Sequence, residues 1–87
     1  MLVAHSAFGH NTLCVNTTGE RNTAIGVNNL IHNITGSYNT AVGTATLYEN
    51  TDGSCNVAVG RETMRMNKIG GFNSALGWKA LYNNLEK

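Results

Sequence analysis

The sequence has no proline, few charged residues and no long apolar run. Charged residues make up 13% of its 87 residues, about half the usual level for globular domains, and the formal net charge is +1. Its six Lys and Arg residues are scattered, so no electrostatic footprint for nucleic acid or an anionic membrane is present. No run of about 18 apolar residues could cross a bilayer, and the opening MLVAHSAF lacks the length and basic flank of a signal peptide. We therefore expect no nucleic-acid partner and no membrane insertion.

What the sequence does contain is a 17-residue repeat. The phrase NTAIG at residues 22–26 returns as NTAVG at 39–43, NVAVG at 56–60 and NSALG at 73–77, always at the same interval. A disordered polar chain has no need to keep such a register, so the period indicates a solenoid in which each copy forms one coil of a single repeat domain. The five copies span residues 5–21, 22–38, 39–55, 56–72 and 73–87.

A few repeat positions hold a nearly constant residue. With the Asn of NTAIG as position 1, position 3 is Ala, position 4 is apolar, position 5 is Gly, position 9 is Leu or Met, and position 12 is Asn. Position 15 is Gly in four copies, so nine of the ten glycines fall at two positions. Fixed Gly and Asn disfavour helices, and the period is shorter than that of leucine-rich repeats. The pattern therefore predicts an all-β fold, a parallel β-solenoid or β-roll of about five coils.

The repeat also predicts how each coil is built. Alternation within NTAIG is typical of a short strand, and we expect position 4 in the core and the Ala of position 3 on the opposite face, close to another chain. A second short strand is expected around positions 8–10, with position 9 in the core. Corners are expected at the Gly of position 5 and at the N-x-x-G of positions 12–15.

The recurring Asn residues are interpreted as structural. Side-chain amides at positions 1 and 12 are expected to form ladders, each amide bonding to its equivalent in the next coil. The glycines of position 5 belong to the same framework. These residues are Asn22, Asn39, Asn56 and Asn73, then Asn16, Asn33, Asn50 and Asn67, and finally Gly26, Gly43, Gly60 and Gly77.

One chain offers little to bury. Each coil has two large, reliably apolar side chains, at positions 4 and 9. Their burial must offset the conformational entropy that is lost when the whole coil becomes ordered. Apolar residues at positions 10 and 17 are irregular, as on a partly covered surface. We therefore expect neighbouring chains to complete the core as a homo-oligomer, whose number composition alone does not give.

The phrases NTAIG, NTAVG and NITGSYNTAVG resemble 17-residue repeats of bacteriophage tail-fibre and tailspike-like proteins, which read roughly N-T-A-[IV]-G-x-x-A-L-x-x-N-T-T-G-S-x. They are also similar to the S-V-A-I-G repeats in the heads of trimeric autotransporter adhesins. The resemblance runs from about Ser6 to Asn84, with departures such as His5, Val57 and Lys68. It implies a homotrimer and a structural or adhesive segment of a virion tail fibre, which is extracellular, acts as a rigid rod and binds a host-surface glycan or protein. A bacterial cell-surface adhesin head is the alternative.

Aromatic side chains are the candidates for receptor contact, because flat rings suit sugar rings. The competing interpretation is that the same rings pack between chains. The candidates are Trp78, Tyr48, Tyr82 and Tyr38.

Catalytic residues, metals and cofactors are not expected. His5, His10 and His32 form no H-x-H pair, and Cys14 and Cys55 lie more than two coils apart, beyond disulfide reach. No two carboxylates occupy equivalent positions in adjacent coils, so a glycosidase pair is not indicated. An ice-binding solenoid is a weaker alternative, because it would need a flat Thr-x-Thr array and position 4 is aliphatic.

Overall fold

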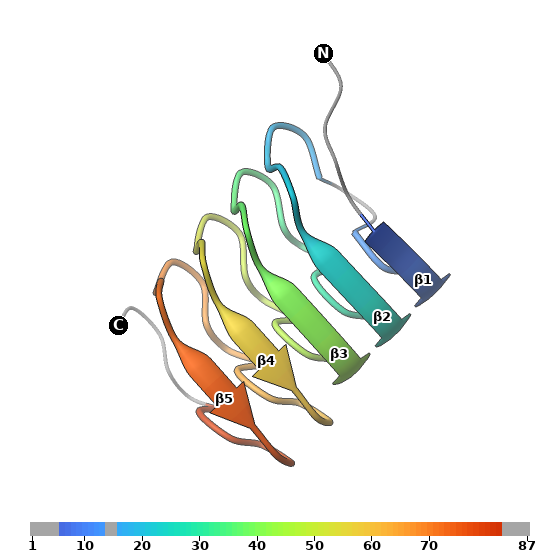
Figure 1. The fold of residues 1–87 in the computed structure, drawn as a ribbon, viewed down its shortest axis with the longest axis vertical. Helices are drawn as coiled ribbons and strands as arrows, with labels where there is room; N and C mark the ends of the chain where they lie inside the picture. Colours follow the sequence, from blue (N-terminus) through green and yellow to red (C-terminus); the bar gives the residue numbers. More distant parts are fainter. Residues whose placement is uncertain (1–5, 14–15, 83–87) are drawn as a thin grey trace.

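In a computed structural model the chain forms a solenoid with five parallel strands in one sheet (Figure 1). The structure describes residues 6–13 and 16–82. Within that part of the chain there is no helix, and the strands lie side by side in sequence order. The prediction of an all-β parallel β-solenoid is confirmed. The strands are β1 (Ser6–His10), β2 (Thr23–Val27), β3 (Thr40–Thr44), β4 (Val57–Val59) and β5 (Ser74–Leu76).

Neighbouring strands pair with an offset of one repeat. Ala24 of β2 lies opposite Ala41 of β3, and Ala41 lies opposite Ala58 of β4. Figure 1 shows the chain leaving each strand, returning behind it and entering the next strand in the same direction. Each repeat position therefore forms a row of equivalent side chains that runs along the solenoid axis.

The residues that line the interior differ from those predicted from the sequence. Ala24, Ala41 and Ala58 at position 3 are fully buried, whereas Phe8 and Leu76 at position 4 are 65% and 79% exposed. The prediction that position 4 is core and Ala faces outward is wrong. Fully buried Asn, Thr, Leu and Met side chains at positions 1, 8, 9 and 12 share this interior with the Ala methyl groups. The strand therefore turns its small side chains inward, toward these larger ones.

Position 9 lies in the core, but not on a second strand. Leu30, Leu47 and Met64 are fully buried, with φ of 50°, 52° and 51°. This left-handed conformation interrupts an extended backbone and occurs rarely in residues other than glycine. The coils still bond here, since the Leu30 N–H donates to the Thr46 carbonyl at 3.1 Å and the Leu47 N–H to the Thr63 carbonyl at 3.0 Å. The predicted strand at positions 8–10 is therefore replaced by a stack of turns.

Both predicted corners are present. At position 5, Gly43 has φ 138°, a conformation that side chains strongly disfavour. At the N-x-x-G corner, the N–H groups of Ile34, Thr35 and Gly36 all donate to the carbonyl of Thr51 in the next coil, at 3.0, 3.1 and 3.1 Å. Three successive N–H groups thus form a nest around one oxygen, and the nest locks this corner onto the following one.

Candidate functional site

The position-12 amides form a continuous hydrogen-bonded row through the interior. Asn33 Nδ2 donates to Asn16 Oδ1 at 2.7 Å, Asn50 Nδ2 to Asn33 Oδ1 at 2.9 Å, and Asn67 Nδ2 to Asn50 Oδ1 at 2.9 Å. Asn50 Nδ2 also donates to the carbonyl of Gly53, in its own turn, at 3.0 Å. Each amide therefore joins its own turn to the neighbouring coil. These hydrogen bonds provide the partners that a buried amide group requires.

The position-1 amides bond mainly to backbone groups, although Asn56 Nδ2 also donates to Asn39 Oδ1 at 3.1 Å, as in the position-12 row. Asn22 Oδ1 accepts the backbone N–H of Asn39 at 2.9 Å, and Asn39 Oδ1 accepts the backbone N–H of Asn56 at 3.0 Å. Asn39 Nδ2 donates to the Gly53 carbonyl at 2.8 Å. These side chains connect the start of each strand with the N-x-x-G corner, so both Asn rows belong to the framework of the rod.

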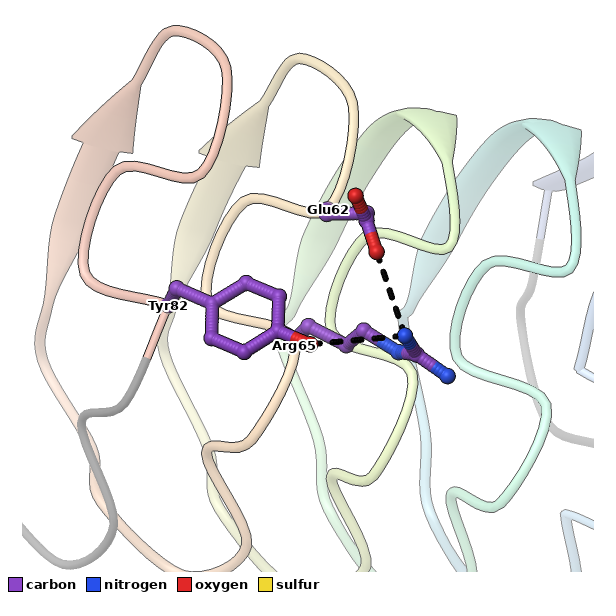
Figure 2. Close-up of polar contacts among 3 residues, drawn as sticks. All are labelled: Glu62, Arg65 and Tyr82. Carbon is purple, nitrogen blue, oxygen red and sulfur yellow. Dashed lines mark hydrogen bonds and ion pairs between the residues drawn. The ribbon is translucent and has the colours of Figure 1, made fainter.

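One side of the solenoid carries an aromatic and cationic cluster around Arg65 (Figure 2). Arg65 Nη1 donates to Glu62 Oε2 at 3.1 Å and to the Tyr82 hydroxyl at 3.4 Å. The guanidinium carbon lies 4.8 Å from the ring centroid of Tyr48, and that ring makes a T-shaped contact with the His32 ring at 5.1 Å between centroids. We call Tyr48, Glu62, Arg65 and Tyr82 the Arg65 cluster. It spans three consecutive coils.

The environment of Arg65 keeps its side chain charged. Burial disfavours the guanidinium ion, but the hydrogen bonds and charge interactions with Tyr82 and Glu62 outweigh that effect and raise the pKa of Arg65 above its usual value. The guanidinium covers one face of Tyr48 and bonds the hydroxyl of Tyr82. Arg65 thus acts as a fixed positive centre that joins neighbouring coils.

The structure divides the four aromatic residues suggested for receptor contact. Tyr48 and Tyr82 lie in the Arg65 cluster, and Lys79 Nζ lies 5.5 Å from the Tyr82 ring centroid and 5.1 Å from that of Trp78. Trp78 is 68% exposed. Tyr38 lies on a different row, at position 17, with the Arg21 guanidinium 5.9 Å from its ring. The rings therefore do not form one platform.

Sequence reasoning missed Arg65 and Lys79 as partners of these rings. The signal was present, because position 10 reads Tyr48, Arg65 and Tyr82 in successive copies. In a parallel stack such a row places a guanidinium between two phenol rings. The sequence prediction treated position 10 as an irregular apolar row and did not include the alternation of charge and ring.

The outer face of the sheet carries a row of apolar side chains. The position-4 row, as we call it, has no polar member in any copy. Phe8, Ile25 and Leu76 are exposed, and the two valines between them are half-buried. The residues are Phe8, Ile25, Val42, Val59 and Leu76.

Within residues 6–13 and 16–82, no group of three or more His, Cys, Asp or Glu side chains is placed to hold a metal ion. Cys55 is a free, half-buried thiol, whereas Cys14 and His5 lie outside the described residues. The described residues also contain no helix of the length and apolarity that crossing a membrane requires.

No protein-family model, curated protein or solved structure matches the chain. The repeat itself is visible in the structure, because residues that pair between neighbouring strands are one copy apart, as Thr23 is from Thr40. Any proposal about function therefore rests on the regular coils and on the side chains that their surfaces expose.

Proposed function

We propose that the chain is a rigid segment of a homotrimeric fibre of the phage tail-fibre or tailspike type, extracellular and part of the virion tail. The bacterial cell-surface adhesin head is the alternative setting for the same rod. In either setting the chain works as a structural element that holds attachment sites away from a surface, rather than as an enzyme.

The stacking of the coils supports a spacer role. In the described part of the chain, neighbouring coils are joined by bonds that recur from copy to copy, for example the nest at Thr51 and the Asn33–Asn50 amide contact at 2.9 Å. Repeat proteins of this kind are stabilised by nearest-neighbour contacts, so length can change without a change of cross-section. Such a body extends along one axis, as a fibre shaft requires.

The main support for the proposed oligomer is the small apolar core of a single chain. Among the described residues the buried apolar cluster consists of three Ala, two Leu and one Met, while the large side chains of Phe8, Leu76 and Trp78 are mostly exposed. Large apolar side chains left in water on a small chain indicate a surface that another molecule covers. Association between copies would bury them and supply stability that one chain lacks.

The solution mass tests this proposal. One chain has a mass of 9.3 kDa, and we expect light scattering to give about three times that value. Circular dichroism on the same sample should show β structure, so that an unfolded chain is not mistaken for a monomer. A folded monomer at 9.3 kDa would contradict the homotrimer.

Surface attachment is a second candidate, and the exposed ring of Trp78 beside Lys79 favours it. A ring with one open face can stack on a sugar, and the nearby ammonium group can bond its hydroxyls or acidic groups. We expect a glycan array to detect binding that Trp78→Ala abolishes. Tyr38→Ala is the matched control, since Tyr38 is also exposed beside a cation but lies on another row. Equal loss in both variants would argue against a site at Trp78.

A further inference from the structure

We propose that the copies meet along the position-4 row, parallel and in the same register, with the row of each copy facing a threefold axis. This inference rests on the proposed homotrimer and names the surface that forms it. The position-4 row was defined above as Phe8, Ile25, Val42, Val59 and Leu76.

The first argument is the composition of the outward rows. Position 2, on the same face of the sheet, contains Ser6, Thr23 and Thr40, and position 6 contains His10 and Arg61. Only the row between them is apolar in every copy. An outward-facing position that stays apolar in all five copies, between rows that vary in polarity, indicates a surface that another molecule covers.

The second argument is spacing. Strand-to-strand distance in a sheet is about 4.8 Å, so the row presents one apolar side chain per coil at that interval. A second copy that lies parallel and in register presents the same groups at the same interval. Val42 then meets Val42 and Val59 meets Val59, without cumulative mismatch along the rod. A partner of different rise would lose register within a few coils.

The third argument is the width of the row, which favours three copies over two. Two sheets that pack face to face, about 10 Å apart, bury their whole facing surfaces. Here that arrangement would bury exposed Arg61 and the hydroxyl side chains of position 2 together with the apolar row. Three sheets around an axis need only their central rows to touch. The outward charge of Arg61 then stays in water at the rim.

The fourth argument is the location of the Arg65 cluster. It belongs to positions 7 and 10, beyond the strands, where Arg65 and Tyr82 are half-buried and already bonded within the chain. Contacts along the position-4 row leave this cluster undisturbed. Trp78 shares position 6 with Arg61 and stays at the same rim, so assembly and any attachment there can coexist on one rod.

Cysteine cross-linking tests the contact surface. In a background with Cys14→Ser and Cys55→Ser, Val42→Cys should oxidise to disulfide-linked dimers on a non-reducing gel. Because three thiols near an axis form one disulfide, about two thirds of the chains should be linked. Asp52→Cys is the matched control, since Asp52 is exposed at the N-x-x-G corner, and it should stay unlinked. Independently, Val42→Asp should reduce the mass to that of one chain, while Thr44→Asp on the adjacent outward row keeps the trimer.

The outcomes separate the two proposals. A trimer by mass in which Val42→Cys does not cross-link, or Asp52→Cys does, overturns the position-4 contact and leaves the homotrimer standing. A monomeric parent protein overturns both. A parent dimer whose Val42→Cys variant links completely keeps the surface but rejects the threefold arrangement.

Discussion

Replacing Asn50 by Leu is expected to lower the free energy of unfolding by about 3 kcal/mol, because three buried polar groups each lose a partner. Asn33 Oδ1 would lose its donor, Asn67 Nδ2 would lose one of its two acceptors, and the Gly53 carbonyl would lose one of its two donors. Leu is similar in size, so the effect reports hydrogen bonding more than packing. Urea denaturation at fixed protein concentration measures it, since association contributes to the apparent stability.

Asn28→Ala is the matched control for the ladder. Asn28 has φ 58° at position 7, and Ala45 already occupies that position in the next coil with φ 57°. Its side chain accepts an exposed hydrogen bond from Asn11 at 3.2 Å, and Ala tolerates this φ less well than Asn, so we expect a loss of about 1 kcal/mol. If Asn50→Leu costs no more than this control, the buried amide row does not stabilise the rod.

Gly43→Ala is expected to disrupt the stack, with a loss of about 4 kcal/mol or more. A methyl group on Gly43 would overlap the carbonyl oxygen of Gly60 in the next coil. The two coils would have to separate, which breaks the bond from Thr46 Oγ1 to the Gly60 carbonyl at 2.5 Å and the bond from the Gly60 N–H to the Val42 carbonyl at 2.8 Å. Circular dichroism during thermal unfolding gives the measurement.

Gly77→Ala separates overlap from backbone strain. Gly77 occupies the same repeat position with φ 118°, but a methyl group there would meet no atom within 4 Å. Only the strain of placing Ala in this conformation remains, and it costs on the order of 1–3 kcal/mol. Equal losses at Gly43 and Gly77 would show that strain alone explains the effect, and that close approach of the coils does not matter.

The fold class followed from the sequence because a fixed 17-residue period constrains the backbone strongly. The assignment of faces did not follow. Alternation in NTAIG shows that Ala24 and Ile25 lie on opposite faces, yet it does not say which face is inside. That choice depends on which other side chains are buried beside the strand, and here Asn22, Asn33 and Leu30 are fully buried together with Ala24.

Two local features were also not predicted. The left-handed φ of 52° at Leu47 is unexpected for a branched apolar residue, and it is maintained by burial of its side chain in the core. The prediction of the aromatic candidates considered each ring separately and did not include the guanidinium of Arg65 between Tyr48 and Tyr82. Row-by-row comparison of the copies would have found it.

The bonds between coils have a mechanical consequence. Amide contacts such as Asn33–Asn50 and the nest at Thr51 run along the rod, so a pulling force on its two ends acts on them in series. The weakest coil then opens first and frees one copy of the repeat, about 58 Å of extended chain, while the coils beyond it stay closed. Under tension, the same repetition that builds the rod makes it yield stepwise, one turn of chain at a time.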